Sequence, residues 1–155
     1  MKNIIPYGKQ KIFNSDFSEI SKTLKSEFIT NGEYVKKFEN SFSKYTKAKY
    51  SVSCSSGTAA IDLALKSIGL KKNDNIIIPS INFIAAANMA RLIGANIFLS
   101  DVDKFTGQMR PVDLINCIKF YKLKKIKAFF VMHNGGSPNS IKEFRNIKNK
   151  YKTIM

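Results

Sequence analysis

Cysteine and histidine are scarce in this chain, which has two cysteines and a single histidine among its 155 residues. Cys54 and Cys117 lie far apart in the sequence, and His133 does not stand at a metal-ligand spacing from either of them. The sequence therefore predicts no metal site. We expect both cysteines to be free and buried.

Long apolar stretches are also missing. No run approaches the roughly 18 to 20 apolar residues of a membrane span, and the start, MKNIIPYGKQ, lacks the apolar segment of a signal peptide. We therefore expect a cytoplasmic protein without a membrane partner. With 44% hydrophobic residues, the chain can bury one sizeable core and is in the size range of a single domain.

Acidic residues are few, 11 against 26 basic ones, and the formal net charge is +15. A positive charge of this size attracts phosphates and raises the question of nucleic acid as a partner. However, only three basic residues are arginines, and the lysines are scattered instead of gathering with aromatic residues on one helix. The densest run, KFYKLKKIKAFF at 119–130, is typical of a helix end, a solvated loop and a strand entry. We therefore expect no nucleic-acid partner.

Amphipathic helices are predicted in the first third of the chain. In 16–29, Phe17, Ile20, Leu24 and Phe28 recur at helical spacing, and a second helix over 34–45 carries an aromatic stripe that includes Phe38. Aromatic stripes of this kind are typical of core packing, so we expect both helices to bury them.

From residue 50 on, short apolar runs alternate with helical patterns. The strands are predicted at 50–54, 75–78, 96–100 and 126–132, and the helices at 58–68, 83–93, 111–120 and 139–150. This alternation predicts a mainly parallel sheet covered by helices, with ligands at the carboxyl ends of the strands. The last residues, YKTIM, begin like one more strand. We therefore expect the chain to be the front part of a longer protein, with poor solubility or self-association when it is alone.

The stretch SVSCSSGTAAIDLAL at 51–65 turns from a strand pattern directly into a helix pattern. Gly57 lets the backbone approach a ligand, while Ser56 and Thr58 offer hydroxyl groups beside the free N–H groups of the first helical turn. These features favour a phosphate. The alternative is a serine-capped helix that binds nothing, because Ser and Thr are ordinary N-caps.

Four stretches together resemble the pyridoxal-phosphate-dependent nucleotide-sugar aminotransferases. They are IPYGKQ at 5–10, FITNGEYVKKFENSFSKYTKAKYSVSCSSGTAAIDLAL at 28–65, NDNIIIPSINFIAAANMARLIGANIFLSDVD at 73–103 and VMHNGGSP at 131–138. The opening and the FITNG stretch are most similar to the branch that aminates C4 of a UDP-4-keto sugar on the route to pseudaminic acid. The resemblance implies glutamate as the amino donor and a homodimer at full length.

The resemblance also assigns roles to residues. In the family, the turn that matches Ser56, Gly57, Thr58 and Ala59 holds the phosphate of pyridoxal phosphate, and the aromatic residue that matches Phe83 stacks on the pyridine ring. The residues that match the segments contacting the nucleotide sugar are Tyr7, Glu27, Phe28, Ile29, Thr30 and Gly57. From the residues alone, Phe83 would be a core residue, and Phe28 and Ile29 would be the last turn of a helix.

As a fold class, the resemblance implies the N-terminal portion of the large α/β domain of such an enzyme. Residues 1–49 would form a helical segment with substrate-contact loops, and residues 50–155 an incomplete cofactor-binding domain. The Schiff-base lysine and the carboxylate that pairs with the ring nitrogen would lie beyond residue 155, so no lysine here is assigned a catalytic role. We interpret His133 as a packing or hydrogen-bonding residue, and Asn139 departs from the aspartate common in relatives. The alternative function is a catalytically inactive remnant that at most binds a phosphate-bearing ligand.

Overall fold

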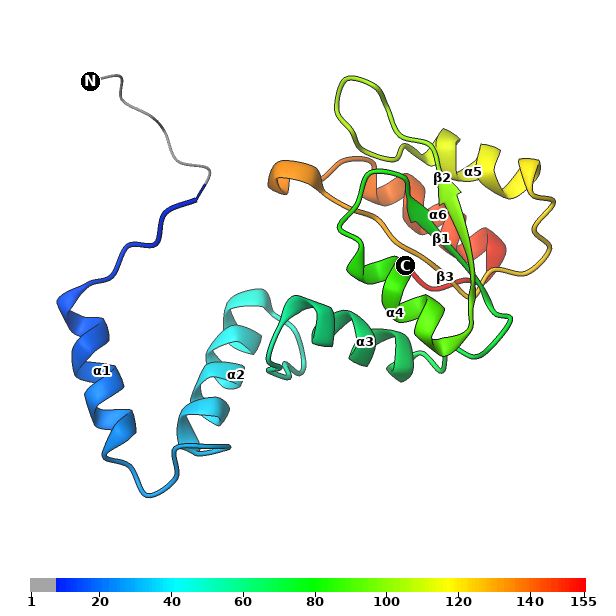
Figure 1. The fold of residues 1–155 in the computed structure, drawn as a ribbon. Helices are drawn as coiled ribbons and strands as arrows, with labels where there is room; N and C mark the ends of the chain where they lie inside the picture. The colour runs from blue at the N-terminus through cyan, green and yellow to red at the C-terminus, as the bar shows by residue number, and fades with distance from the viewer. Residues whose placement is uncertain (1–7) are drawn as a thin grey trace. The chain divides into compact units, whose positions relative to one another are not determined.

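The computed structural model describes residues 8–155, which form two compact units. The first unit extends to Ser53, and the second comprises Cys54–Met155 (Figure 1). Strands occur only in the second unit of the described chain. Tyr7, one of the predicted substrate residues, lies outside the described residues.

The first unit contains two helices, α1 (Asn14–Leu24) and α2 (Glu33–Thr46). α1 begins after Phe13, whose N–H donates to the carboxylate of Asp16 at 2.8 Å. An acidic side chain in the first turn also complements the partial positive charge of the helix start. α1 ends earlier than predicted, because the hydroxyl of Ser26 contacts the carbonyl oxygens of Thr23 and Phe28 at 2.6 and 3.1 Å and favours a turn there.

The first unit has no buried residue among those described. Phe17 and Leu24 of α1 keep 64% and 61% of their surface exposed, and Phe38 of α2 keeps 59%. The prediction that these stripes form core is therefore wrong for the described chain. The periodicity correctly predicts helices, but it does not identify an apolar surface that covers them.

The second unit alternates helices and strands around a three-stranded parallel sheet of order β2-β1-β3. Its elements are α3 (Gly57–Ser67), β1 (Asn75–Pro79), α4 (Ala85–Ile93), β2 (Asn96–Ser100), α5 (Pro111–Phe120), β3 (Ala128–Phe129), the 3-10 helix η1 (Asn134–Gly136) and α6 (Ile141–Tyr151). In register, Asn75 of β1 lies opposite Asn96 of β2, and Ile76 lies opposite Ala128 of β3. The predicted helices and the parallel sheet are thus present.

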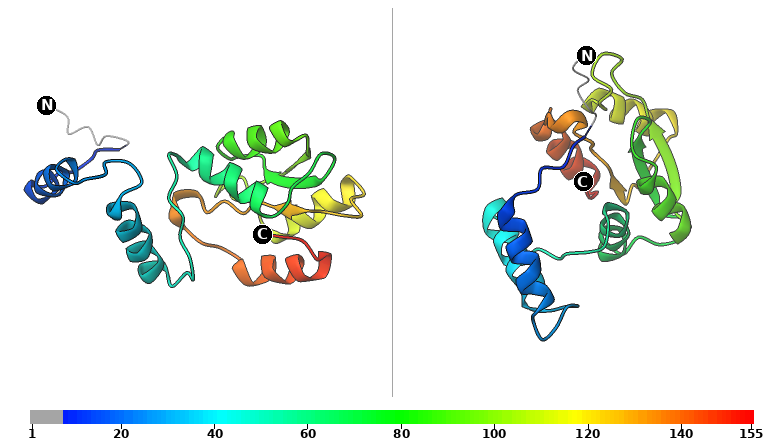
Figure 2. Two further views of the ribbon diagram at one scale, coloured as in Figure 1. Left: turned by 90° about the horizontal axis from the view of Figure 1, so that it is seen from below. Right: turned by 60° about the vertical axis from the view of Figure 1, so that its left-hand side comes forward.

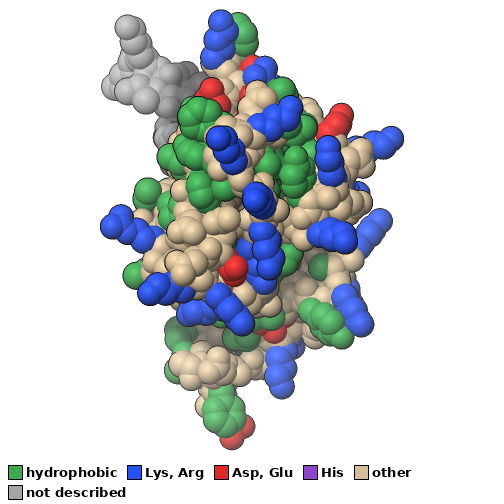
Figure 3. Space-filling view, turned by 90° about the vertical axis from the view of Figure 1, so that its right-hand side faces the viewer, with side chains coloured by type: hydrophobic (Ala, Val, Ile, Leu, Met, Phe, Trp, Pro, Cys, Tyr) green, Lys and Arg blue, Asp and Glu red, His purple; other side chains and the backbone are tan. Residues whose placement is uncertain are grey.

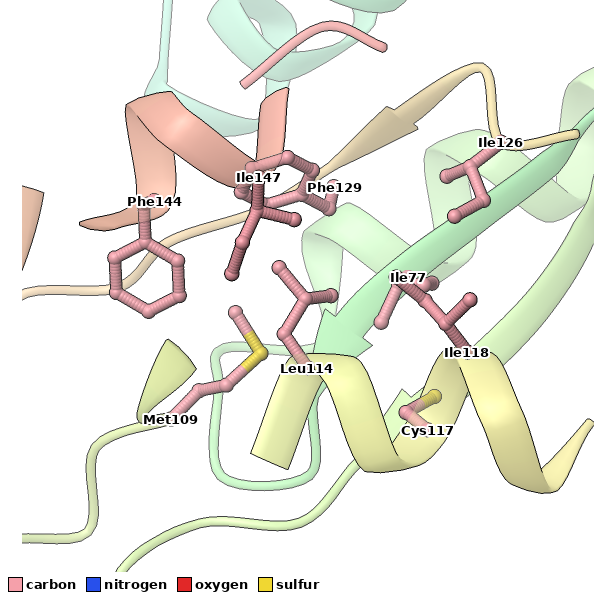
Figure 4. Close-up of a cluster of buried hydrophobic side chains, with 9 residues drawn as sticks. All are labelled: Ile77, Met109, Leu114, Cys117, Ile118, Ile126, Phe129, Phe144 and Ile147. Atoms are coloured by element: carbon pink, nitrogen blue, oxygen red, sulfur yellow. The ribbon is translucent and has the colours of Figure 1, made fainter. Parts of the chain in front are cut away.

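Apolar side chains cover both faces of this sheet. Ile76 and Ile78 of β1 pack with α3 and α4 on one face, and Ile77 packs with α5 and α6 on the other, since successive side chains of a strand alternate. Figure 2 shows these two helix layers on either side of the strands. The cluster on the second face is drawn in Figure 4 and consists of Ile77, Met109, Leu114, Cys117, Ile118, Ile126, Phe129, Phe144 and Ile147. Because both faces of the sheet are buried, the sequence of β1 is a continuous apolar run instead of an alternating pattern.

Two predicted strands differ in the structure. Residues 50–54 are not a strand: Tyr50 and Val52 are 76% and 78% exposed, and no described strand pairs with them. A β-prone segment without a hydrogen-bonding partner does not form a strand. The strand predicted at 126–132 is limited to β3. Ile154 does form a parallel bridge with Ala128, as the pattern of the last residues predicts.

One cysteine prediction is also wrong. Cys117 is buried in the cluster of Figure 4, and burial raises the pKa of its thiol, but Cys54 is exposed. Cys54 precedes α3 in the segment that does not join the sheet, so no core forms around it. Among the described helices, none combines the length and apolar character needed to cross a membrane.

Candidate functional site

α3 begins directly at the serine- and glycine-rich turn that the sequence singles out. Ser56 is the N-cap residue, and its hydroxyl accepts a hydrogen bond from the N–H of Ala59 at 3.1 Å. Its carbonyl oxygen accepts a second one from Ala60 at 3.0 Å. Ser56 therefore acts as a helix cap, which accounts for one hydroxyl of the turn without any ligand.

Two other donors of the first turn are left open. No described residue accepts a hydrogen bond from the N–H of Gly57 or Thr58, and the Thr58 hydroxyl has no partner in residues 8–155. No atom of the described residues lies within 4 Å of the position where a Cβ of Gly57 would stand. An anion can approach the backbone here and meet both N–H groups, together with a helix charge of about half an elementary unit. The residues of this turn fit a phosphate.

The turn lies at the edge of the second unit where the strands end. α3 leads to the start of β1, and α4 leads from the end of β1 to the start of β2, so both helices run opposite to the parallel strands. Their N-termini consequently lie toward the carboxyl ends of the strands, as Figures 1 and 2 show. Open α/β sheets bind their ligands at this edge. The predicted strand before the turn is missing, but the turn still lies at the predicted edge.

Phe83 follows β1 in the loop that leads to α4, and so it comes from the same edge of the sheet. Its side chain is 70% exposed. This exposure excludes the core role that its residue type alone favours. An exposed ring on a short loop between a strand and a helix is available to lie against a flat ligand.

The other predicted substrate residues belong to the turn between α1 and α2. A pocket of about 330 Å³ in this turn is lined by Ser26, Glu27, Phe28 and Glu33. Ile29 and Phe28 are each 65% exposed, and Thr30 is also exposed. A Cβ at Gly32 would stand 2.6 Å from the carbonyl oxygen of Phe28, so the close turn depends on this glycine. Phe28 and Ile29 are therefore exposed residues of a turn beyond the end of α1, and not its last helical turn as their residue types alone favour.

His133 lines a mainly apolar pocket of about 380 Å³ that is formed by α3, β3 and the last residues of the chain. Its Nδ1 atom is buried and has no hydrogen-bond partner in the part of the chain that the structure describes. The neighbouring Gly135 and Gly136 have φ values of 64° and 72° and belong to the turn of η1. The glycine pair is thus a turn, as its sequence context favours.

A polar network in the loop between β2 and α5 was not predicted from the sequence. The N–H groups of Thr106 and Phe105 donate to the carboxylate of Asp103 at 3.0 and 3.1 Å and hold its pKa below the usual range. Arg110 lies 3.2 Å from the same carboxylate. Its guanidinium also donates twice to Asp113, at 2.9 Å each, which lowers the pKa of Asp113.

This network ties two loops of the second unit together. The side-chain amide of Gln108 donates to the carbonyl oxygens of Asn134 and Ser137 at 3.4 and 3.3 Å, so the β2–α5 loop is joined to the η1 segment. The sequence carries a signal for part of it. Asp113, two residues after the helix-opening Pro111, has the spacing of a capping carboxylate. The link from Gln108 has no local signal, because its partners are more than 25 residues away.

Free backbone N–H groups at a helix N-terminus, at the carboxyl edge of a parallel sheet, are typical of the α/β proteins that hold phosphate-bearing ligands. The sequence matches the DegT/DnrJ/EryC1/StrS aminotransferase family over residues 10–155. The chain therefore belongs to this family, and the resemblance is confirmed at that level.

GDP-perosamine synthase of Escherichia coli O157:H7 is a curated relative of the chain, 31% identical over 135 residues. The match covers 86% of this chain and 36% of that protein. The chain thus spans little more than a third of the length of this relative.

Solved structures agree in fold. A Streptococcus pneumoniae protein described as a sugar aminotransferase, in its PLP form, has a TM-score of 0.86 at 24% identity, over 97% of this chain and 38% of its own. A GDP-4-keto-6-deoxymannose-3-dehydratase with a trapped PLP-glutamate geminal diamine has a TM-score of 0.86 at 25% identity, over 97% of this chain and 40% of its own. The predicted fold class is confirmed, and the predicted cofactor, pyridoxal phosphate, agrees with both neighbours.

Proposed function

We propose that this chain forms the phosphate-binding portion of a pyridoxal-phosphate-dependent sugar aminotransferase. The observation that carries the proposal is the open start of α3, where the N–H groups of Gly57 and Thr58 have no acceptor in the described chain and the backbone is accessible. Membership of the aminotransferase family supports a cofactor phosphate as the anion.

The residues of the turn have different roles in this proposal. Gly57 and Thr58 donate to the phosphate through their N–H groups, and Thr58 adds its hydroxyl. The N–H of Ala59 is already bonded to Ser56, so these two residues shape the turn. Phe83 provides a flat apolar surface for the pyridine ring. When bound, the cofactor supplies the electron sink that transamination needs.

For the complete reaction, we propose amino transfer from glutamate to C4 of a UDP-4-keto-6-deoxy-N-acetyl sugar, on the route to pseudaminic acid, by a homodimeric enzyme. Tyr7, Glu27, Phe28, Ile29 and Thr30 would contact the nucleotide sugar, with Gly57 leaving space above the cofactor. The proposal is supported by the stretches at 5–10 and 28–65 and by a relative that is named for an aminosugar, perosamine. Since no lysine of this chain is assigned to the Schiff base, the chain alone is expected to transfer no amino group.

The phosphate site is tested with pyridoxamine 5′-phosphate, because this amine does not react with the many surface lysines as an aldehyde would. Calorimetry should detect weak binding to the 155-residue chain and none for pyridoxamine, which lacks the phosphate. Gly57→Ala is the informative variant. Its new methyl group meets no atom of residues 8–155, so stability should rise by about 0.4–1 kcal/mol through restriction of the unfolded state.

In the same variant, affinity should fall by about tenfold, because the new methyl group would occupy the space in which the phosphate approaches the backbone and would weaken at least one of its charge-assisted hydrogen bonds. If Gly57→Ala binds pyridoxamine 5′-phosphate as well as the parent chain does, the assigned position of the phosphate is wrong. Amination of a UDP-4-keto sugar is then assayed with the chain alone and with a polypeptide that carries the remaining part of a family member. Failure of the pair, with phosphate binding intact, favours the inactive remnant.

A further inference from the structure

A basic hollow lies at the edge of the second unit opposite to the candidate cofactor site. It has a volume of about 480 Å³, and its charged side chains are Asp74, Lys124, Lys125, Lys127 and Lys152. Residues 73–75 lead into β1, and residues 124–127 lead into β3, so the hollow lies at the amino ends of the parallel strands. Figure 3 shows a face of the molecule over which Lys and Arg side chains are spread and acidic ones are few.

The positive charges of the hollow are not neutralised within the described chain. None of the four lysines forms an ion pair with residues 8–155. Asp74, the one carboxylate among the described lining residues, accepts a hydrogen bond from the backbone N–H of Lys71 at 2.9 Å and thus closes its own turn. Four like charges gathered around one hollow repel one another, and a bound polyanion would relieve this repulsion.

The side chains that line the hollow indicate which kind of polyanion it can bind. Its described lining residues include no arginine for bidentate recognition and one aromatic residue, Tyr151, which is only partly exposed. Of its large apolar side chains, Ile126 is 4% and Ile154 is 38% exposed, so the hollow offers no prominent anchor for a lipid bilayer. Lysine ammonium groups are flexible point charges that bind phosphates without reading a base.

We propose that this hollow, together with its four lysines, binds a chain of phosphate groups through charge alone. The ligand class is a linear phosphate polymer, whether inorganic polyphosphate or the backbone of a single-stranded RNA. The site is independent of the proposed cofactor site, because the start of α3 lies at the opposite edge of the sheet. Three of its lysines belong to the dense basic run at 119–130, and the fold adds Lys152 from the end of α6.

The test titrates the full 155-residue chain with inorganic polyphosphate and, separately, with oligouridine of equal charge. The variant replaces Lys124, Lys125, Lys127 and Lys152 by Gln. The matched control replaces four exposed lysines outside the hollow by Gln, namely Lys9, Lys36, Lys44 and Lys142, and so has the same net charge. Affinity should fall by about tenfold or more in the variant and by no more than about twofold in the control, with binding that weakens steeply as salt increases.

Equal losses in the variant and the control would overturn the proposal, since binding would then follow net charge only. Binding of oligouridine without polyphosphate would also overturn it, because it indicates base recognition. So would binding to phosphatidylglycerol vesicles without binding to either polymer. A second measurement needs no variant: polyphosphate should protect the four lysines of the hollow from acetylation more than the four control lysines, as read by peptide mass spectrometry. Uniform protection would contradict the site.

Discussion

The two units of this protein use the same helical periodicity with opposite results. In the second unit, apolar residues from helices on both faces meet the sheet, and Leu114 and Phe144 are 0% and 1% exposed. In the first unit, helices with equally regular stripes keep Phe17 and Phe38 more than half exposed. Amphipathic spacing therefore determines that a helix has an apolar face, while burial depends on whether another element offers a matching surface.

The largest difference in unfolding free energy is expected when a phenylalanine is replaced by alanine in each of the two units. Phe144→Ala removes a ring that packs 6.1 Å from the ring of Phe129 in the cluster of Figure 4, and the cavity should cost about 3–5 kcal/mol of unfolding free energy. Phe17→Ala removes an exposed ring and should change it by less than about 0.5 kcal/mol. Urea unfolding followed by circular dichroism measures both. A loss of similar size at Phe17 would show that the stripe of α1 is buried in solution.

A smaller difference in unfolding free energy is expected when one carboxylate of an ion pair is neutralised in each unit. Asp113 is buried, accepts from the backbone N–H of Arg110 at 2.9 Å and pairs with its guanidinium, so Asp113→Asn should cost about 1–2 kcal/mol. The pair of Glu33 with Lys37 in the first unit is exposed, and Glu33→Gln should cost less than about 0.5 kcal/mol. Chemical denaturation of both variants at neutral pH tests this difference.

The Asp113 contribution should also depend on pH with a definite sign. Because Arg110 lowers the pKa of Asp113 in the folded state, its stabilisation is fully present above the unfolded value of about 3.9 and is lost as the pH falls through the lower folded value. The difference between the parent chain and Asp113→Asn should therefore be constant near neutrality and shrink below about pH 4. A difference that does not change in acid would contradict the assigned ion pair.

The elements of the second unit follow from local pattern, and the errors come from partners that local pattern does not contain. The run Ile76–Ile78 correctly predicts a strand, and Gly94 and Pro111 are residue types typical of the helix end and the helix start at which the structure places them. Residues 50–54 have strand composition, but no neighbouring strand pairs with them in the described chain. The turn at Ser56 was predictable because capping is local, whereas the link from Gln108 to η1 and the lysine hollow depend on tertiary contacts.

Removing the N-cap of α3 should destabilise the protein by about the free energy of one hydrogen bond, whereas the same substitution inside α2 should not. Ser56→Ala removes the acceptor of the Ala59 N–H and should lower stability by about 1 kcal/mol. Ser41 of α2 is exposed and forms no side-chain hydrogen bond with the described residues, so Ser41→Ala should have almost no effect. Thermal unfolding of the two variants compares them. Equal melting temperatures would indicate that the start of α3 is not held by Ser56.

The smallest expected effect is a loss of affinity for pyridoxamine 5′-phosphate in a variant whose stability does not change. Thr58→Val keeps the shape of the side chain and removes a hydroxyl that has no partner in the described chain, so folding loses nothing, but the proposed phosphate loses one donor. Affinity for pyridoxamine 5′-phosphate should fall by about fivefold, equivalent to about 1 kcal/mol. Thr30→Val, in the turn of the first unit, is the matched substitution and should leave this affinity unchanged, because Thr30 is assigned to the nucleotide sugar. Calorimetric titration of both variants tests the assignment, because a loss of affinity in both variants, or in neither, would contradict a phosphate held at Thr58.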